Sequence, residues 1–179
     1  MRIKLAGRRF VIGAVLTATL AAGITVYASF NEPIGVGVMA HSELIGGPAT
    51  VLMRRLTIFP GEVLGWHYHP GAGAYTIVTQ GTLTVEDGCG SETVYTQGQA
   101  FLEPPNRVHR GKNLGNTDVI TAQTFIVPAG TSTSVSLAAP LCGPPAKVDD
   151  CKDGGWQIYN HPLSFENQGV CEQYVITGR

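Results

Sequence analysis

The chain has 179 residues, a mass of 18.9 kDa and 44% hydrophobic residues, which suits one folded domain with a small addition and excludes a disordered polyampholyte. Its net charge of −1 hides an asymmetry, because residues 1–28 hold four of the 12 basic side chains and none of the 13 acidic ones. The remainder has 8 basic and 13 acidic residues and no basic stripe, which excludes a typical nucleic-acid-binding protein.

The N-terminus has the three parts of an export signal. A positive segment ends at Arg9, a mostly apolar segment covers residues 10–27, and small residues precede a cleavage site after Ala28. We therefore expect residues 1–28 to be a signal peptide and the mature protein to be secreted, periplasmic or part of the cell envelope. An uncleaved membrane anchor is the alternative, and this segment is the only expected contact with a membrane. The pair Arg8-Arg9 leaves Sec and twin-arginine export both open.

The middle of the chain has the pattern of short strands separated by glycine and proline. No segment places an apolar residue about every 3.6 residues, as an amphipathic helix would. Regular short strands with such turns predict an all-β fold, either a sandwich or a double-sheet barrel. The candidate strands cover residues 49–59, 63–69, 74–80, 82–86, 93–96, 100–103, 108–112 and 119–127.

The C-terminal part differs in composition from the strand-rich part. Residues 128–147 are rich in Ala, Ser, Thr and Pro, which indicates a linker, or a final edge strand followed by a linker. Residues 148–179 are too few to bury a core, so we expect a small module held by a disulfide and a few aromatic side chains. The predicted organisation is a β-barrel domain over 29–130, a linker over 131–147 and a C-terminal module over 148–179.

Cysteine usage agrees with export. An even number of cysteines in an exported chain predicts two disulfides, and the spacing alone leaves three connectivities open. No pair has the C-x-x-C spacing of a structural zinc site. The four cysteines are Cys89, Cys142, Cys151 and Cys171.

Three of the five histidines have an informative spacing. His67 and His69 are two residues apart, so on a strand both side chains point to the same face. His109 lies on a later candidate strand. Three imidazoles that converge inside a barrel would bind one metal ion and leave positions open for water or substrate. His41 and His161 have no such spacing, and we expect them at the surface.

The first histidine segment resembles a motif of the cupin family. That motif is Gly, five residues, His-x-His, three or four residues, Glu, six residues, Gly. This chain has Gly61, then His67 and His69, then Ala74 at the Glu position, then Gly81.

The segment around His109 resembles the second cupin motif, which is Gly, five residues, Pro-x-Gly, two residues, His, three residues, Asn. This chain has Gly98, Pro104, Asn106 in place of the second Gly, His109 and Asn113. Asparagine tolerates the left-handed backbone conformation that such a turn needs. The resemblance covers about residues 49–130 and implies a small jelly-roll β-barrel with a metal site inside it.

The resemblance implies a site with His67, His69 and His109 as ligands of one divalent transition metal, which the sequence leaves open among Fe, Mn, Ni, Cu and Zn. Ala74 removes the usual carboxylate ligand, so such a site keeps more positive charge and favours an anionic or chelating ligand. Glu103 is best placed to supply a carboxylate, as ligand or general base. A surface carboxylate at the barrel rim is the other interpretation, and it is the one we favour.

Alternation along the strands assigns other side chains near the expected site. Thr76 and Val78 share the face of Ala74 and are expected to line the cavity. Arg54 and Arg55 are neighbours on a candidate strand, so they cannot both face inward.

The resemblance also bears on the cysteines. Related secreted cupins place cysteines at similar positions, which favours the pairs Cys89–Cys142 and Cys151–Cys171. Residues 151–171 are similar to a short C-x-x-G-G-W…F-x-N-Q-G-x-C element at the ends of assorted secreted bacterial proteins. That similarity implies no chemistry.

Three functions remain open from the sequence. The first is an exported metalloenzyme, at its sharpest a dioxygenase-like cupin acting on a small chelating or anionic molecule. The second is a module that binds a metal or a small ligand without turnover, which the missing carboxylate at position 74 favours. The third is a structural envelope protein. A homodimer is possible, because cupins often pair through edge strands.

Overall fold

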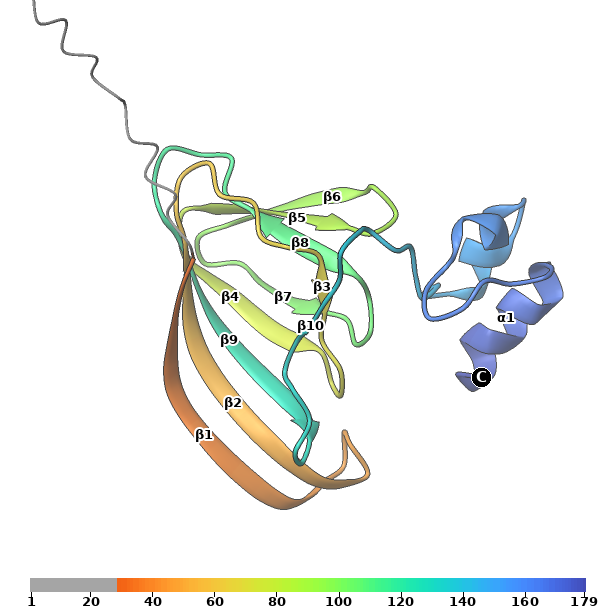
Figure 1. The fold of residues 1–179 in the computed structure, drawn as a ribbon, viewed down its shortest axis with the longest axis horizontal. Coiled ribbons are helices and arrows are strands. Elements are labelled where there is room, and N and C mark those ends of the chain that lie inside the picture. The colour runs from red at the N-terminus through yellow and green to blue at the C-terminus, as the bar shows by residue number, and fades with distance from the viewer. Residues whose placement is uncertain (1–28) are drawn as a thin grey trace, which may run out of the picture.

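The structure is a computed structural model that describes residues 29–179, so the expected signal peptide lies outside the described residues. In this part of the chain, strands form two five-stranded sheets whose neighbours are antiparallel (Figure 1). The first sheet consists, in spatial order, of β1 (Phe30–Ser42), β2 (Gly47–Ile58), β9 (Val119–Pro128), β4 (Ala74–Gln80) and β7 (Ala100–Glu103). The second consists of β10 (Val135–Ser136), β3 (His67–Tyr68), β8 (His109–Lys112), β5 (Thr82–Asp87) and β6 (Glu92–Thr96). This confirms the expected all-β jelly roll.

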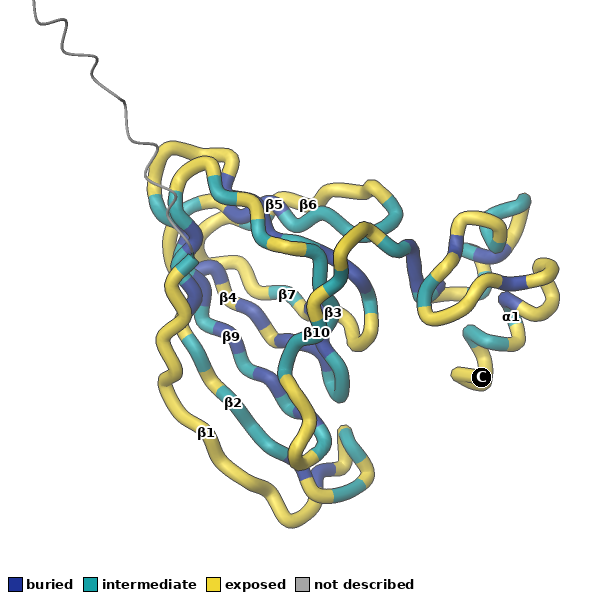
Figure 2. Tube along the Cα trace, viewed as in Figure 1, coloured by how far each residue is buried: buried dark blue, intermediate teal, exposed yellow. Residues whose placement is uncertain are grey.

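Buried residues alternate with more exposed ones along β4 and β9 (Figure 2). Ala74, Thr76 and Val78 are buried, whereas Tyr75 and Ile77 are exposed. This period of two is typical of an antiparallel sheet with one solvated face. The apolar core consists of Leu56, Ile58, Val78, Leu83 and Val119.

β1 is an edge strand that the sequence analysis did not predict. Pro33 and nearby glycines interrupt its strand pattern, and the pairing with β2 is irregular between Pro33 and Gly35. The start of β1 is anchored by one carboxylate. The N–H of Ser29 donates to Oε1 of Glu62 (2.6 Å), and the N–H of Phe59 donates to Oε2 (3.0 Å).

One predicted strand is much shorter than expected. The strand expected over 63–69 is reduced to β3 and an isolated bridge between Val63 and Lys112. Gly65 lies between them and has no side chain to pack, which weakens a strand. The expected linker over 131–147 contains β10, which pairs with β3, in agreement with the edge-strand interpretation of this segment.

The C-terminal residues form a small helical module beside the barrel (Figure 1). It consists of two 3₁₀ turns, η1 (Val148–Cys151) and η2 (Gly155–Ile158), and the helix α1 (Gln168–Thr177). No helical period of apolar residues in the sequence predicts this helix. Caps define it instead, since Asn167 accepts from the N–H of Val170 (3.0 Å) and Gly178 ends it with φ 73°. Although the module is small, it does bury a core of cysteines, Tyr159 and Phe165.

Both disulfides that the resemblance favours are present. Cys89–Cys142 joins the β5–β6 turn to the segment after the barrel, and Cys151–Cys171 joins η1 to α1. Two disulfides are typical of an oxidising compartment. Among residues 29–179, no helix has the length and apolarity to cross a membrane.

Candidate metal centre

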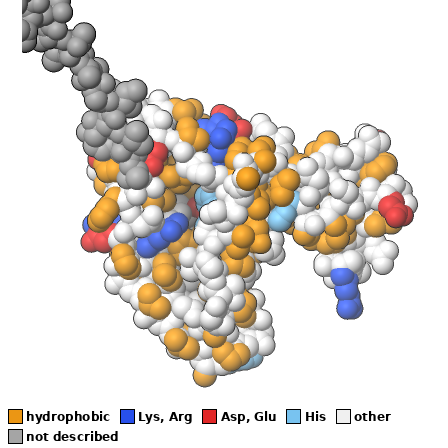
Figure 3. All heavy atoms as spheres, viewed as in Figure 1, with side chains coloured by type: hydrophobic (Ala, Val, Ile, Leu, Met, Phe, Trp, Pro, Cys, Tyr) orange, Lys and Arg blue, Asp and Glu red, His pale blue; other side chains and the backbone are white. Residues whose placement is uncertain are grey.

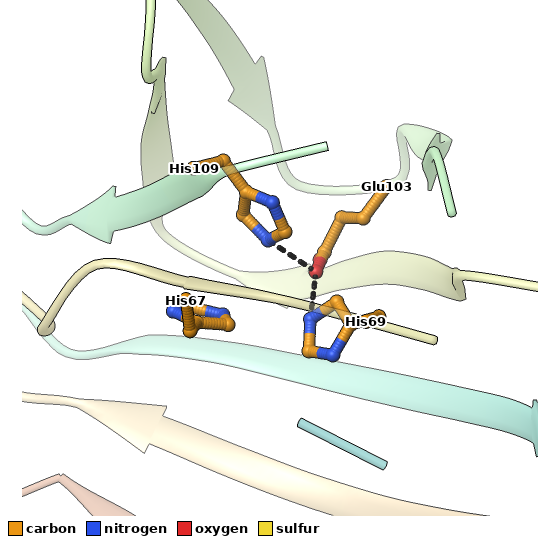
Figure 4. Close-up of side chains that lie close together, drawn as sticks. All are labelled: His67, His69, Glu103 and His109. Atoms are coloured by element: carbon orange, nitrogen blue, oxygen red, sulfur yellow. Dashed lines mark hydrogen bonds and ion pairs between the residues drawn. The ribbon is translucent and has the colours of Figure 1, made fainter. Parts of the chain in front are cut away.

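Four polar side chains meet inside the barrel (Figure 4). His67 on β3 is the register partner of His109 on β8, His69 lies just after β3, and Glu103 is the last residue of β7. One ligand atom from each of the four lies within 4.8 Å of all the others. The structure therefore brings together the three histidines that the spacing singled out, and it adds a carboxylate.

A backbone carbonyl holds each imidazole ring. The Nδ1–H groups of His67 and His109 each donate to the carbonyl two residues earlier (2.8 Å), and that of His69 donates to Thr133 (2.7 Å). Because a carbonyl can only accept, Nδ1 carries the proton in each ring. In the neutral ring, Nε2 then has a free lone pair, and an imidazole in this form can bind a metal through Nε2.

Glu103 is buried within the cluster, with only 6% of its surface exposed. Its Oε2 lies 2.8 Å from Nε2 of His69 and 3.0 Å from Nε2 of His109. Its Oε1 accepts hydrogen bonds from Thr76 (2.6 Å) and Gln123 (3.2 Å). The interpretation of Glu103 as a surface carboxylate is therefore wrong, because the pairing of β7 with β4 turns this side chain into the barrel.

The position of Glu103 makes up for the alanine at position 74. Ala74 on β4 and Glu103 on β7 are direct register partners. Side chains of such partners share a face, with Cβ atoms about 4.5–5.5 Å apart. The carboxylate that Ala74 lacks is thus offered from the opposite position on the neighbouring strand.

Burial and mutual contacts set the charges of the cluster. Burial, with a smaller effect of the neighbouring His109, lowers the pKa of His67 to about 4. Burial would raise the pKa of Glu103, but its contacts, first among them the hydrogen bond with His109, outweigh burial and hold that pKa well below its ordinary value. Burial likewise opposes the charged form of His109, yet the hydrogen bond with Glu103 leaves the pKa of His109 raised. At neutral pH, the ring of His67 is therefore neutral and Glu103 is an anion.

The donor set fits a divalent transition metal. Nε2 of His69 is fully buried and makes no aligned hydrogen bond, although it lies 2.8 Å from Oε2 of Glu103. With the proton on Nδ1, this nitrogen and the carboxylate oxygen are two acceptors that repel each other. A cation held by both atoms removes the conflict. Three imidazoles and one carboxylate are ligands that Zn, Cu, Fe and Ni accept.

A cavity of about 270 Å³ opens onto the cluster, and three cluster members line it together with Arg54 of β2. Figure 3 shows a basic side chain close to a histidine on this face of the barrel. Arg55 points to the opposite side and pairs with Glu32 (3.0 Å), as strand alternation predicts. The chain thus places one arginine, and not its neighbour, inside the cavity.

Gln123 on β9 is a site residue that the sequence analysis missed. It donates to Glu103 and accepts from Nε of Arg54 (2.7 Å), so it joins the arginine to the cluster. Strand alternation could have identified Gln123, because it lies two residues from both Thr121 and Phe125 and therefore shares their inward face.

Other expectations near the site have mixed outcomes. Thr76 and Val78 face inward as expected, but Thr76 binds Glu103 and Val78 belongs to the apolar core. Asn106 adopts φ 58°, the left-handed conformation expected for a residue that replaces glycine. His161 is only partly exposed, with its ring centre 5.2 Å from that of Tyr68.

A comparison with protein families identifies the barrel. Residues 54–127 match the family described as cupin domain. The chain contains a cupin domain. All four residues of the cluster lie within this cupin match.

Individual relatives of the cupin domain are distant. The auxin-binding proteins ABP19b and ABP19a of Prunus persica are 30% and 29% identical to this chain over 83 residues, which is 44% of this chain and 40% of each relative. The match thus spans less than half the length of these relatives.

Solved structures with a similar fold are also distant. A protein with a double-stranded β-helix domain from Klebsiella pneumoniae is 24% identical, with 59% of this chain and 84% of that chain covered and a TM-score of 0.41. Oxalate decarboxylase of Bacillus subtilis is 18% identical, with 54% and 29% covered and a TM-score of 0.43.

Acidification is expected to destabilise the metal-free protein between pH 6.5 and pH 4. His67 has an ordinary pKa of 6.5 and a pKa of about 4 in the fold, so in this range the unfolded chain takes up a proton that the folded chain refuses. Glu103, with its lowered pKa, loses its contribution only at lower pH, and His109, with its raised pKa, loses its contribution as the pH rises above 6.5. Urea unfolding at both ends of the range should show a smaller pH dependence for His67→Gln than for the wild type. Equal pH dependence would contradict the assignment.

Proposed function

We propose that this is an exported cupin that holds one divalent transition metal on His67, His69 and His109, with Glu103 as the fourth ligand. The metal site would bind a small chelating or anionic molecule and, at the sharpest, act on it as a dioxygenase does. The proposed organisation is a signal peptide over 1–28, the cupin domain over 29–130, a linker over 131–147 and the module over 148–179. The two disulfides support an oxidising location.

One observation carries the proposal. Three histidines whose Nδ1 atoms are all engaged by carbonyls direct their other nitrogens toward one another and toward a buried carboxylate. A metal ion bound there supplies Lewis-acid polarisation or redox chemistry. The protein's part is to orient the rings and to supply one negative charge.

Glu103 suits the role of ligand better than that of general base. Its lowered pKa makes it a weak base near neutral pH. Thr76 and Gln123 fix its second oxygen, which holds the carboxylate in one orientation. Glu103 therefore returns a carboxylate to the site but not the general base whose absence favours the alternative, a module that binds a metal or small ligand without turnover.

Elemental analysis by plasma mass spectrometry tests the proposal. Mature protein from Ser29 onward, isolated from its natural compartment, should contain about one transition metal per chain. His67→Ala/His69→Ala should contain none, because it loses two of the ligands. His161→Ala is the matched control, since this histidine lies outside the cluster, and it should keep the metal. Wild-type protein without metal, even after reconstitution, would overturn the proposal.

A further inference from the structure

Arg54 lines the cavity, and among the described residues only one of its three guanidinium nitrogens makes a hydrogen bond. Its Nε donates to Gln123 (2.7 Å), and its Cζ lies 4.7 Å from the ring centre of Phe125. Among residues 29–179, its two terminal nitrogens donate no hydrogen bond and join no ion pair. A guanidinium held in this way presents two parallel N–H groups that match a carboxylate.

Thr121 adds an unpaired hydroxyl to the same cavity. Its side chain is fully buried, it lines the cavity, and its Oγ1 has no hydrogen-bond partner among the described residues. Buried polar atoms are nearly always paired, because an unpaired one loses the hydrogen bonds that it would make with water. A ligand that accepts a hydrogen bond from this hydroxyl would satisfy it.

The arginine lies close to the metal centre. A single amide joins them, because Gln123 accepts from Arg54 and donates to Glu103. The same aromatic ring touches both groups, since the ring of His69 lies 5.0 Å from that of Phe125. A small molecule that reaches the metal centre can therefore also reach Arg54.

We propose that Arg54 and Thr121 form a carboxylate subsite, and that the ligand is a small 2-hydroxy or 2-oxo dicarboxylate. Its hydroxy-acid or oxo-acid end lies at the metal centre and its distal carboxylate lies on Arg54. This inference rests on the proposed function and adds the class of ligand. A cavity of about 270 Å³ admits molecules of this size, because it lies just below the roughly 300–1,000 Å³ of sites for drug-sized ligands.

Two acids that differ only at the distal end test the subsite. Malate carries the distal carboxylate, and 2-hydroxybutyrate has a methyl group in its place. Calorimetric titration of the metal-loaded mature protein should show that malate binds at least about tenfold more tightly, since a hydrogen bond to a charged group contributes roughly 1.5–3 kcal/mol. In Arg54→Gln the two acids should bind with about equal affinity, and the metal content should be unchanged.

Further variants separate recognition from folding. Arg55→Gln removes the neighbouring arginine on the outer face and should keep the preference for malate. Arg54→Lys keeps the charge and should retain part of the preference if Arg54→Gln proves unstable. Thr121→Val should lower malate affinity with no effect on 2-hydroxybutyrate, because only the distal carboxylate meets this hydroxyl.

Each remaining outcome decides between the two proposals. Metal-loaded protein that binds both acids equally, or neither, would overturn the carboxylate subsite and leave the metal centre standing. Wild-type protein that holds no metal would overturn the proposed function. The same titrations on that metal-free protein would then decide the subsite alone, because an Arg54-dependent preference for malate supports it and equal affinities overturn it.

Discussion

Replacing Glu103 by glutamine is expected to lower the affinity of the centre for its metal by at least about tenfold. Glutamine keeps the size of the side chain but removes the only negative charge within the cluster of His67, His69 and His109. Competition with a chelator of known affinity measures the change. An unchanged affinity would contradict the assignment of Glu103 as a ligand.

A double variant tests whether a carboxylate on β4 can replace the carboxylate on β7. Because Ala74 and Glu103 are register partners, Ala74→Glu/Glu103→Ala moves the carboxylate to the position usual in cupins. This double variant should recover most of the affinity that Glu103→Ala loses. Ala74→Gln/Glu103→Ala has the same volume without the charge, and it should recover none.

Removing the Cys89–Cys142 disulfide is expected to destabilise the protein by about 4 kcal/mol, because this link closes a loop of 53 residues. The effect should reach the barrel, since the N–H of Gly88 donates to Val108, directly before His109 (2.8 Å). Urea unfolding of Cys89→Ser/Cys142→Ser measures the loss. A free energy of unfolding equal to that of the wild type would contradict the prediction.

The other disulfide is the matched control for this experiment. Cys151→Ser/Cys171→Ser opens a loop of 20 residues, for which the same relation gives about 3 kcal/mol, and both cysteines lie within the core of the module. The two tryptophans separate the regions, because Trp66 packs against Arg110 in the barrel and Trp156 against the module core. Each tryptophan is followed alone by adding Trp66→Phe or Trp156→Phe to Cys151→Ser/Cys171→Ser. The fluorescence of Trp156 should then show that the module has unfolded, while that of Trp66 shows a folded barrel. Simultaneous unfolding at both tryptophans would contradict this.

The sequence predicted those parts of the site that depend on local spacing. His67 and His69 had to share a face because they lie two residues apart on an extended chain, and the second motif marked His109. The environment of Glu103 depends instead on which strand lies beside β7 and in which register, and local spacing contains neither fact. The same holds for Arg54, since alternation showed that Arg54 and Arg55 cannot both face inward but did not show whether either one does.

The fold was predictable to a similar degree. β4 and β7 have the expected boundaries, because alternating side chains and glycine turns define them. β1 was missed because Pro33 and its neighbouring glycines hide a strand that exists through its pairing with β2. α1 was missed because caps and a disulfide, and not an apolar stripe, specify it.

The anchoring of Ser29 by Glu62 has a consequence for maturation. If the leader is removed after Ala28, the nitrogen that donates to Glu62 changes from an amide to an ammonium group. A hydrogen bond from a neutral donor to the carboxylate then becomes an ion pair between an ammonium group and that carboxylate. Ser29 also lines the cavity, so processing would add a positive charge to the cavity wall. The precursor and the mature protein would then differ in their attraction for an anionic molecule.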